Sequence, residues 1–148
     1  MVFAVSTNVM KIYLAGSFER REEMARAKEI LTSAGHDVYM PFDLKIPNAW
    51  DYPNAEWGLM VFTSDIEAID WADYLVLLSY GRMSTAGSSW EAGYAYAKGK
   101  KVIVVEMTDE IMSLMVANGR YATVDGLEGL EAYNWEIMPK SRSNTEQK

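Results

Sequence analysis

The sequence predicts a single α/β domain built on an open parallel sheet of about five strands, with helices on both faces. Short apolar runs alternate with longer segments of helical periodicity, which favours strand and helix units in alternation. The runs YLVLLS and KVIVVE are apolar through their centres, as is typical of strands covered on both faces. The length of 148 residues fits one domain. This combination indicates a flavodoxin/Rossmann-like arrangement.

The first half of the chain predicts a strand, a helix, a strand and a long helix: 11–16, 19–34, 37–40 and 54–72. In the first helix, Met24, Ala27 and Leu31 recur at helical spacing, and Gly35 supplies a C-terminal stop. Pro41 ends the second strand, and the proline-rich stretch up to residue 53 predicts a long loop. The long helix carries apolar residues from Trp57 onward at helical spacing, which predicts an inward-facing stripe.

The second half predicts a strand, a helix, a strand, a short helix and a last strand: 74–79, 88–98, 101–106, 109–118 and 122–124. A polar, glycine-bounded connection, 81–87, precedes the first of these helices, and Gly99 ends it. A helical turn and an aromatic segment follow the last strand. We expect an N-terminal extension over 1–10, the domain over 11–139, and a disordered tail over 140–148.

Composition narrows the function classes. The net charge of −7 and the pI of about 4.7 argue against nucleic-acid binding, which relies on clustered Lys and Arg. There are no cysteines, and His36 is the one histidine, so thiolate and multi-histidine metal sites are excluded. The sequence has no apolar run long enough for a membrane helix and no signal-peptide pattern, so a cytoplasmic protein is expected. Carboxylates are therefore the expected acid, base or nucleophile.

The candidate site follows from the predicted sheet, because ligands of open parallel sheets bind beyond the carboxyl ends of the strands. Segments 15–18, 40–45 and 81–91 lie there. Gly87 would let a ligand approach the backbone, and Glu91 lies about one turn into the helix, where the helix dipole favours an ionised carboxylate. Glu91 is either a nucleophile or an acid that only supports its helix. Asp65, in the middle of the long helix, faces either water or a pocket.

Other polar residues have simpler explanations. His36 lies between a helix and a strand and is expected to be structural. Asp70 and Asp73 are assigned solvated or capping roles. Arg20 and Arg21 open a helix and could meet a phosphate, although a solvated first turn also explains them. The methionine-rich stretch 111–115 has helical spacing and is expected in the core or at a subunit contact.

Three segments carry a resemblance to a known family. KIYLAGSF, SDIEAIDWADYLVLL and GSSWEAGYAYAKGKKVIVV, in this order and with similar gaps, resemble the nucleoside 2-deoxyribosyltransferase family. The resemblance runs from about Lys11 to Pro139. It implies an enzyme that breaks and remakes the N-glycosidic bond of 2'-deoxyribonucleosides. It also implies a homo-oligomer, built from dimers up to a hexamer, in which a neighbour completes each site.

The resemblance assigns roles to individual residues. Glu91 matches the family's nucleophile, and Asp65 matches the proton donor and acceptor for the base. Tyr13 matches a tyrosine that holds the nucleophile, and Phe18 an aromatic residue beside the substrate. We expect Glu91 to stay ionised and Asp65 to be protonated near neutrality. The other predicted substrate-binding residues are Gly16, Lys45, Thr85, Gly87, Ser88 and Ser113. Neither a metal nor an organic cofactor is predicted.

Three positions depart from the family pattern and keep a second enzyme class open. Thr85 replaces an aspartate that binds the sugar, Ser113 replaces an asparagine that reaches a neighbour's substrate, and Lys45 replaces an amide that reads the base. The first two changes suit a 2'-deoxynucleoside 5'-monophosphate N-glycosidase, a hydrolase, with hydroxyls as phosphate donors. Those hydroxyls would come from Ser84, Thr85, Ser88 and Ser89. A nucleotide-sensing module without catalysis is the third reading.

Overall fold

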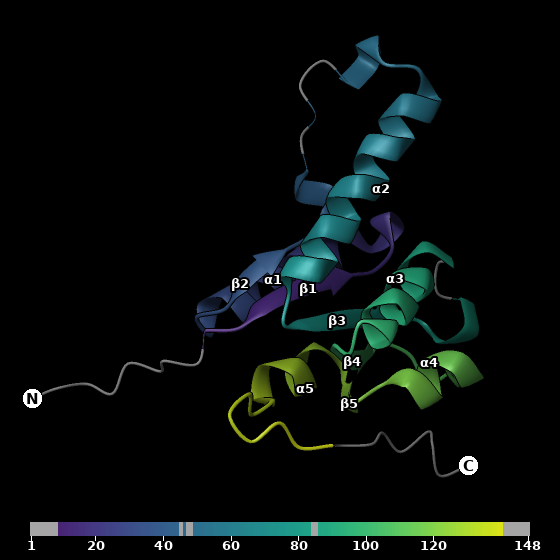
Figure 1. Ribbon diagram of the computed structural model, residues 1–148. Coiled ribbons are helices and arrows are strands. Elements are labelled where there is room, and N and C mark those ends of the chain that lie inside the picture. The colour runs from purple at the N-terminus through teal and green to yellow at the C-terminus, as the bar shows by residue number, and fades with distance from the viewer. Residues whose placement is uncertain (1–8, 45, 47–48, 84–85, 141–148) are drawn as a thin grey trace, which may run out of the picture.

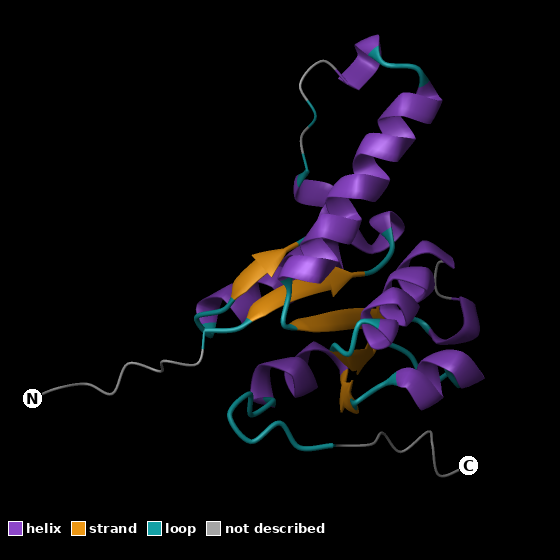
Figure 2. Ribbon diagram, in the orientation of Figure 1, coloured by secondary structure: helices purple, strands orange, loops and turns teal. Residues whose placement is uncertain are grey.

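The computed structural model describes residues 9–44, 46, 49–83 and 86–140. Its five strands are β1 (Lys11–Ala15), β2 (Asp37–Tyr39), β3 (Tyr74–Ser79), β4 (Lys101–Glu106) and β5 (Ala122–Asp125). They form one sheet (Figure 2). The strand order is β2-β1-β3-β4-β5, and every neighbouring pair is parallel. The predicted fold class is confirmed. This strand order is that of flavodoxin-like proteins.

In the described part of the chain, four α-helices connect successive strands and a fifth follows β5: α1 (Arg21–Ser33), α2 (Asn54–Trp71), α3 (Ala86–Ala97), α4 (Leu114–Gly119) and α5 (Gly126–Ala132). Four single 3₁₀ turns lie in the loops: η1 (Phe18–Arg20), η2 (Pro41–Asp43), η3 (Ala49–Asp51) and η4 (Gly81–Met83). Gly35 and Gly99 follow α1 and α3 with φ of 96° and 78°, a conformation that favours glycine. The predicted helix stops are therefore confirmed.

The sheet separates two apolar cores, because side chains of a strand alternate between its faces. On one face, Ile12 and Leu14 of β1 pack with residues of α1 and α5, such as Leu31 and Leu130. On the other face, Tyr13 of β1 and the strand residues that point to the same side, such as Leu75 and Val104, pack with residues of α2 and α3. The two central strands, β3 and β4, are buried on both faces, as their apolar composition predicts.

Two expectations about helices need correction. The short helix predicted over 109–118 begins only at Leu114, because Ser113 adopts an extended backbone and its hydroxyl accepts a hydrogen bond from the Val116 amide as an N-cap. The long helix α2 does not bury its whole apolar stripe. Its N-terminal half extends beyond the sheet (Figure 1), so Trp57 and Phe62 are 44% and 51% exposed.

The predicted end segments, 1–10 and 140–148, lie almost entirely outside the described residues. Within the described ranges, no helix combines the length and the apolar character that crossing a membrane requires.

Candidate active site

The candidate site lies at the reversal of strand order in the sheet. β1 has β2 on one side and β3 on the other, so the connections after β1 and β3 leave the sheet towards opposite faces and open a crevice. A cavity of about 960 Å³ is found there. Its walls come from the turns after β1 and β2, from α2 and from the first turns of α3. This volume is in the range typical of small-molecule sites.

Glu91 reaches the cavity from α3. Its carboxylate accepts a hydrogen bond from the hydroxyl of Tyr13, which is completely buried in the middle of β1. Burial raises the pKa of Glu91 to about 7, the hydrogen bond from Tyr13 lowers it, and the nearby charge of Asp65 raises it. Burial and the Glu91 charge raise the pKa of Tyr13 far above its ordinary value. Tyr13 therefore remains a neutral hydrogen-bond donor.

Asp65 reaches the same cavity from α2. Its carboxylate accepts a hydrogen bond of 3.2 Å from the hydroxyl of Tyr39, in β2. Burial raises the pKa of Asp65 above its ordinary value, and the hydrogen bond from Tyr39 opposes this shift. Of the two readings left open for Asp65, the structure supports the pocket, because the C-terminal half of α2 lies against the sheet.

The pKa of Glu91 departs from the expectation, whereas that of Asp65 shifts in the expected direction. We expected an ionised Glu91 and a protonated Asp65, but burial raises the pKa of both groups, and that of Glu91 to about 7. The hydrogen bond from Tyr13 only partly offsets the loss of water around Glu91. Because the two groups interact, they titrate as a pair.

Four of the predicted substrate-binding residues line the cavity: Gly16, Phe18, Gly87 and Ser88. Phe18 is 62% exposed and meets Phe42 edge to face, with ring centroids 5.4 Å apart. These two rings form an aromatic edge on the side of β1 and β2. A Cβ on Gly87 would meet no protein atom within 4 Å, so the space beside this helix start is open to a ligand.

The remaining predicted residues lie elsewhere. Ser113 and Ser89 line a second cavity of about 330 Å³ between α3 and α4, on the other side of α3 from Glu91. Ser88 and Ser89 therefore cannot both face one ligand in the main cavity. A substrate contact from Ser113 requires a neighbouring copy of the chain. Lys45, Ser84 and Thr85 lie outside the described residues.

Several residues of the site were not predicted. The hydroxyl donor Tyr39 was missed, although it follows from register, since Tyr39 pairs with Tyr13 across β2 and β1. The apolar wall was missed as well; it includes Phe42, Trp57, Phe62 and Trp90. The ring centroids of Phe62, in α2, and Trp90, in α3, lie 5.6 Å apart. The helical spacing of Trp57 and Phe62 predicts core packing, and only the extension of α2 past the sheet makes these two side chains part of a cavity wall.

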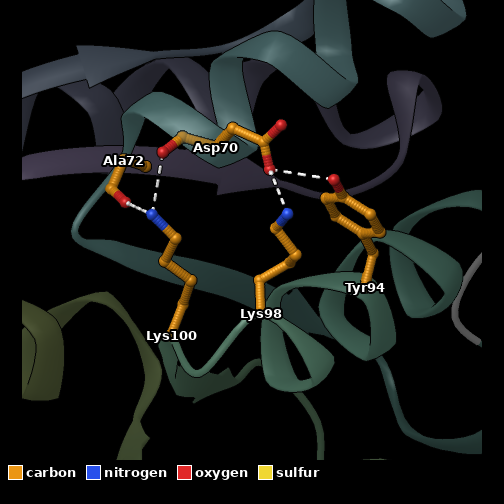
Figure 3. Close-up of polar contacts among 5 residues, drawn as sticks. All are labelled: Asp70, Ala72, Tyr94, Lys98 and Lys100. Atoms are coloured by element: carbon orange, nitrogen blue, oxygen red, sulfur yellow. Dashed lines mark hydrogen bonds and ion pairs between the residues drawn. The ribbon is translucent and has the colours of Figure 1, made fainter.

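The two helices that carry the carboxylates are tied together at the end away from the cavity (Figure 3). Asp70, five residues after Asp65, accepts a hydrogen bond of 2.8 Å from Tyr94 and forms an ion pair of 3.8 Å with Lys98. Lys100 donates to the backbone carbonyls of Asp70 and Ala72 at the end of α2, at 2.8 and 2.5 Å. A cation at these carbonyls also complements the helix dipole. Asp70 thus has a partner in α3 and is not merely solvated.

The polar residues set aside in the sequence have structural contacts. His36 Nδ1 accepts a hydrogen bond from the Met10 amide, and its ring packs on Trp135, which confirms the structural role expected for it. The guanidinium of Arg20 lies 4.4 Å from the ring centre of Tyr80. In the described part of the chain, no group of three or more His, Cys, Asp or Glu residues is arranged to hold a metal ion.

The chain is similar to known proteins in sequence and in fold. A family model described as nucleoside 2-deoxyribosyltransferase matches residues 12–128. The 2-deoxyribosyltransferase from the psychrotolerant bacterium Bacillus psychrosaccharolyticus is 30% identical, with a TM-score of 0.79, and the match covers 89% of this chain and 98% of that chain. No curated protein matches the chain.

Two further solved structures share the fold at lower identity. A conserved protein from Enterococcus faecalis V583 is 22% identical, with a TM-score of 0.53 and 94% of each chain covered. The Clostridium botulinum CMP N-glycosidase BcmB is 16% identical, with a TM-score of 0.53, covering 81% of this chain and 94% of that chain. The family model spans most of the chain, and the match to the Bacillus 2-deoxyribosyltransferase covers 89% of it. This chain therefore belongs to the nucleoside 2-deoxyribosyltransferase family.

Proposed function

We propose that this protein is a nucleoside 2-deoxyribosyltransferase, which moves 2-deoxyribose from one nucleobase to another through a covalent intermediate on Glu91. The observation that carries the proposal is that Glu91 and Asp65, from two different helices, face one largely apolar cavity. Two carboxylates with separate duties are what a double displacement at an anomeric carbon requires.

In the first half-reaction, a carboxylate oxygen of Glu91 forms a bond to C1' of the bound deoxynucleoside. The bond between C1' and the base nitrogen breaks, and its electron pair goes to the base. The protonated carboxyl of Asp65 gives its proton to the departing base, so no base anion has to leave. The products are a deoxyribosyl ester on Glu91 and an ionised Asp65.

In the second half-reaction, an incoming base gives its N–H proton to the Asp65 carboxylate. The freed nitrogen attacks C1', and the ester bond breaks to return the Glu91 carboxylate. The productive resting form carries one proton on the pair, located on Asp65. Tyr13 supports this form, because its hydrogen bond stabilises the ionised Glu91.

The apolar walls favour transfer over hydrolysis. Two pairs of aromatic rings in the cavity wall, Phe18 with Phe42 and Phe62 with Trp90, suit flat nucleobases. A base that covers these rings also keeps water from the ester. We therefore expect exchange to exceed hydrolysis when a free base is present.

We also propose that the protein forms a homo-oligomer. Apolar side chains that the domain does not bury support this: Leu59 of α2 is 64% exposed, and Leu114 and Met115 of α4 are 79% and 84% exposed. Ser113, at the start of α4, would then reach a neighbour's site. Sedimentation velocity tests this assembly, and a monomer at assay concentration would refute it.

A second candidate function is hydrolysis of deoxynucleoside 5'-monophosphates. It is favoured by Thr85, a hydroxyl residue at a family aspartate position, and by the open helix start at Gly87 and Ser88, where backbone amides suit a phosphate. Against it, Ser89 faces the other cavity. Of the four residues whose hydroxyls could bind a phosphate, Ser84 and Thr85 lie outside the described residues.

Chromatography of reaction mixtures tests the two functions. Purified protein is incubated with deoxyinosine or thymidine, or with the matching 5'-monophosphates, each with and without adenine. Deoxyadenosine formed from the free nucleosides supports the transferase. Base and deoxyribose 5-phosphate released from the monophosphates alone would replace it with the hydrolase. Glu91→Ala should remove nearly all turnover, and an active Glu91→Ala protein would refute the nucleophile assignment.

A further inference from the structure

Two tyrosines lie side by side beneath the two carboxylates. Tyr13 of β1 and Tyr39 of β2 are register partners in the parallel sheet, and their rings stack with centroids 5.5 Å apart and planes inclined by 25°. The hydroxyl of Tyr13 donates to Glu91, and that of Tyr39 donates to Asp65. Each tyrosine thus serves one carboxylate, and the stack joins the two tyrosines.

The hydrogen bond from Tyr39 is important because Asp65 lies where α2 begins to leave the sheet. Its helix, α2, is anchored to the sheet near its C-terminal end, where Ala68 and Ile69 are buried. The N-terminal part extends away from the sheet. An aspartate side chain at the edge of that anchored part has room to rotate into the cavity or towards solvent. The hydrogen bond that the structure gives to Asp65 comes from the sheet, and it selects one rotamer.

We propose that Tyr39 is a positioning residue that holds Asp65 for proton transfer through its hydroxyl, while its ring, stacked on Tyr13, keeps the two carboxylates in fixed relative positions. This inference rests on the proposed function of Asp65 but adds a residue that acts only through it. Tyr39 does not line the cavity, so it orients the proton donor without touching the substrate. Loss of the hydroxyl should slow proton transfer and leave substrate binding unchanged.

The kinetic test uses Tyr39→Phe, which removes the hydroxyl and keeps the stacked ring. With deoxyinosine or thymidine, kcat should fall about tenfold, the effect of losing one hydrogen bond, with KM unchanged. With 7-methyldeoxyguanosine, whose base leaves without taking a proton, sugar transfer to Glu91 should hardly change. Tyr121→Phe is the matched control, because it also removes one partly buried tyrosine hydroxyl. That hydroxyl donates a hydrogen bond to the Met138 carbonyl, on the opposite face of the sheet.

A double-mutant cycle separates positioning from general disruption. If Tyr39 acts only through Asp65, then Tyr39→Phe has no further effect in the Asp65→Asn background. An equal loss in both backgrounds, or an equal loss with the 7-methylated substrate, would overturn the proposal.

A measurement on the resting protein keeps this inference distinct from the proposed function. The Asp65 carboxyl is faced by Tyr39 from β2, Tyr13 from β1 and Glu91 from α3. Carbon-13 NMR of the aspartate carboxyls should show a higher titration midpoint for Asp65 in Tyr39→Phe and no change in Tyr121→Phe. An unchanged midpoint in Tyr39→Phe overturns the positioning role even if the enzyme is active. A raised midpoint in a protein without base exchange upholds the contact and refutes only the proposed function.

Discussion

The raised pKa of Glu91 means that this residue destabilises the folded protein when it is ionised. A carboxyl whose pKa rises from 4.5 to about 7 costs about 3 kcal/mol to ionise in the fold, at about 1.4 kcal/mol per tenfold change in the ionisation equilibrium. Water and mobile dipoles in the open cavity reduce this cost, and we expect about half of it, about 1.5 kcal/mol, to be measurable. Active-site groups commonly carry such a cost in stability.

The sign of the effect follows from proton linkage. Because the folded protein binds the Glu91 proton more tightly than the unfolded chain does, the Glu91 contribution to stability is fully present below pH 4.5 and is lost as the pH rises through about 7. Glu91→Gln removes the ionisation and keeps an oxygen that accepts from Tyr13. It should match the wild type within a few tenths of a kcal/mol at about pH 4.5, and exceed it by about 1.5 kcal/mol at about pH 8.

Urea unfolding, followed by tryptophan fluorescence at the two pH values, measures this difference. Glu29→Gln, on the exposed face of α1, is the control and should show no pH-dependent change relative to the wild type. If Glu91→Gln changes stability equally at both pH values, or is less stable than the wild type at the higher one, then burial does not govern the ionisation of Glu91.

Three further predictions concern catalysis and packing. Glu91 must be ionised to attack, so kcat/KM should rise with pH through about 7, the pKa of Glu91, and fall only where Asp65 loses its proton; in Asp65→Asn, measured with 7-methyldeoxyguanosine, that alkaline fall should be absent from a stopped-flow pH profile, and a persistent fall would assign it to another group. Gly16→Ala places a Cβ against the sulfur of buried Met24 and should lower the free energy of unfolding by about 1–3 kcal/mol in urea titrations, whereas an unchanged midpoint would show that Met24 repacks freely. Gly87→Ala meets no protein atom and should preserve stability while raising KM severalfold in steady-state assays; an unchanged KM would mean that no substrate group approaches this backbone.

Local patterns in the sequence were sufficient for the architecture. The apolar runs predict β3 and β4 with the observed bounds, and the glycines after α1 and α3 help to predict these helices to within one or two residues at each end. The exception is α4, where an apolar stretch at helical spacing concealed the cap at Ser113 and led to a helix predicted five residues too early. A single side chain that satisfies a backbone amide decides such a boundary, and periodicity does not register it.

The site was predictable only in part. Glu91 and Asp65 were identified as a pair through the family resemblance. From the residues alone, Glu91 could equally have supported its helix, and Asp65 could have faced water. Tyr39 became visible only through register, because two strands distant in sequence must pair before their tyrosines can stack.

The sequence by itself determined the order of elements and the parallel sheet, and it indicated the two carboxylates that we propose for the chemistry. The tertiary structure decided which neighbours those carboxylates have. It placed Ser88 and Ser89 in different cavities, turned the exposed half of α2 into an aromatic wall, and buried Glu91 deeply enough to raise its pKa. The physical reason is that burial, electrostatic environment and hydrogen bonding between distant segments depend on how far each helix extends along the sheet, and no local pattern encodes that distance.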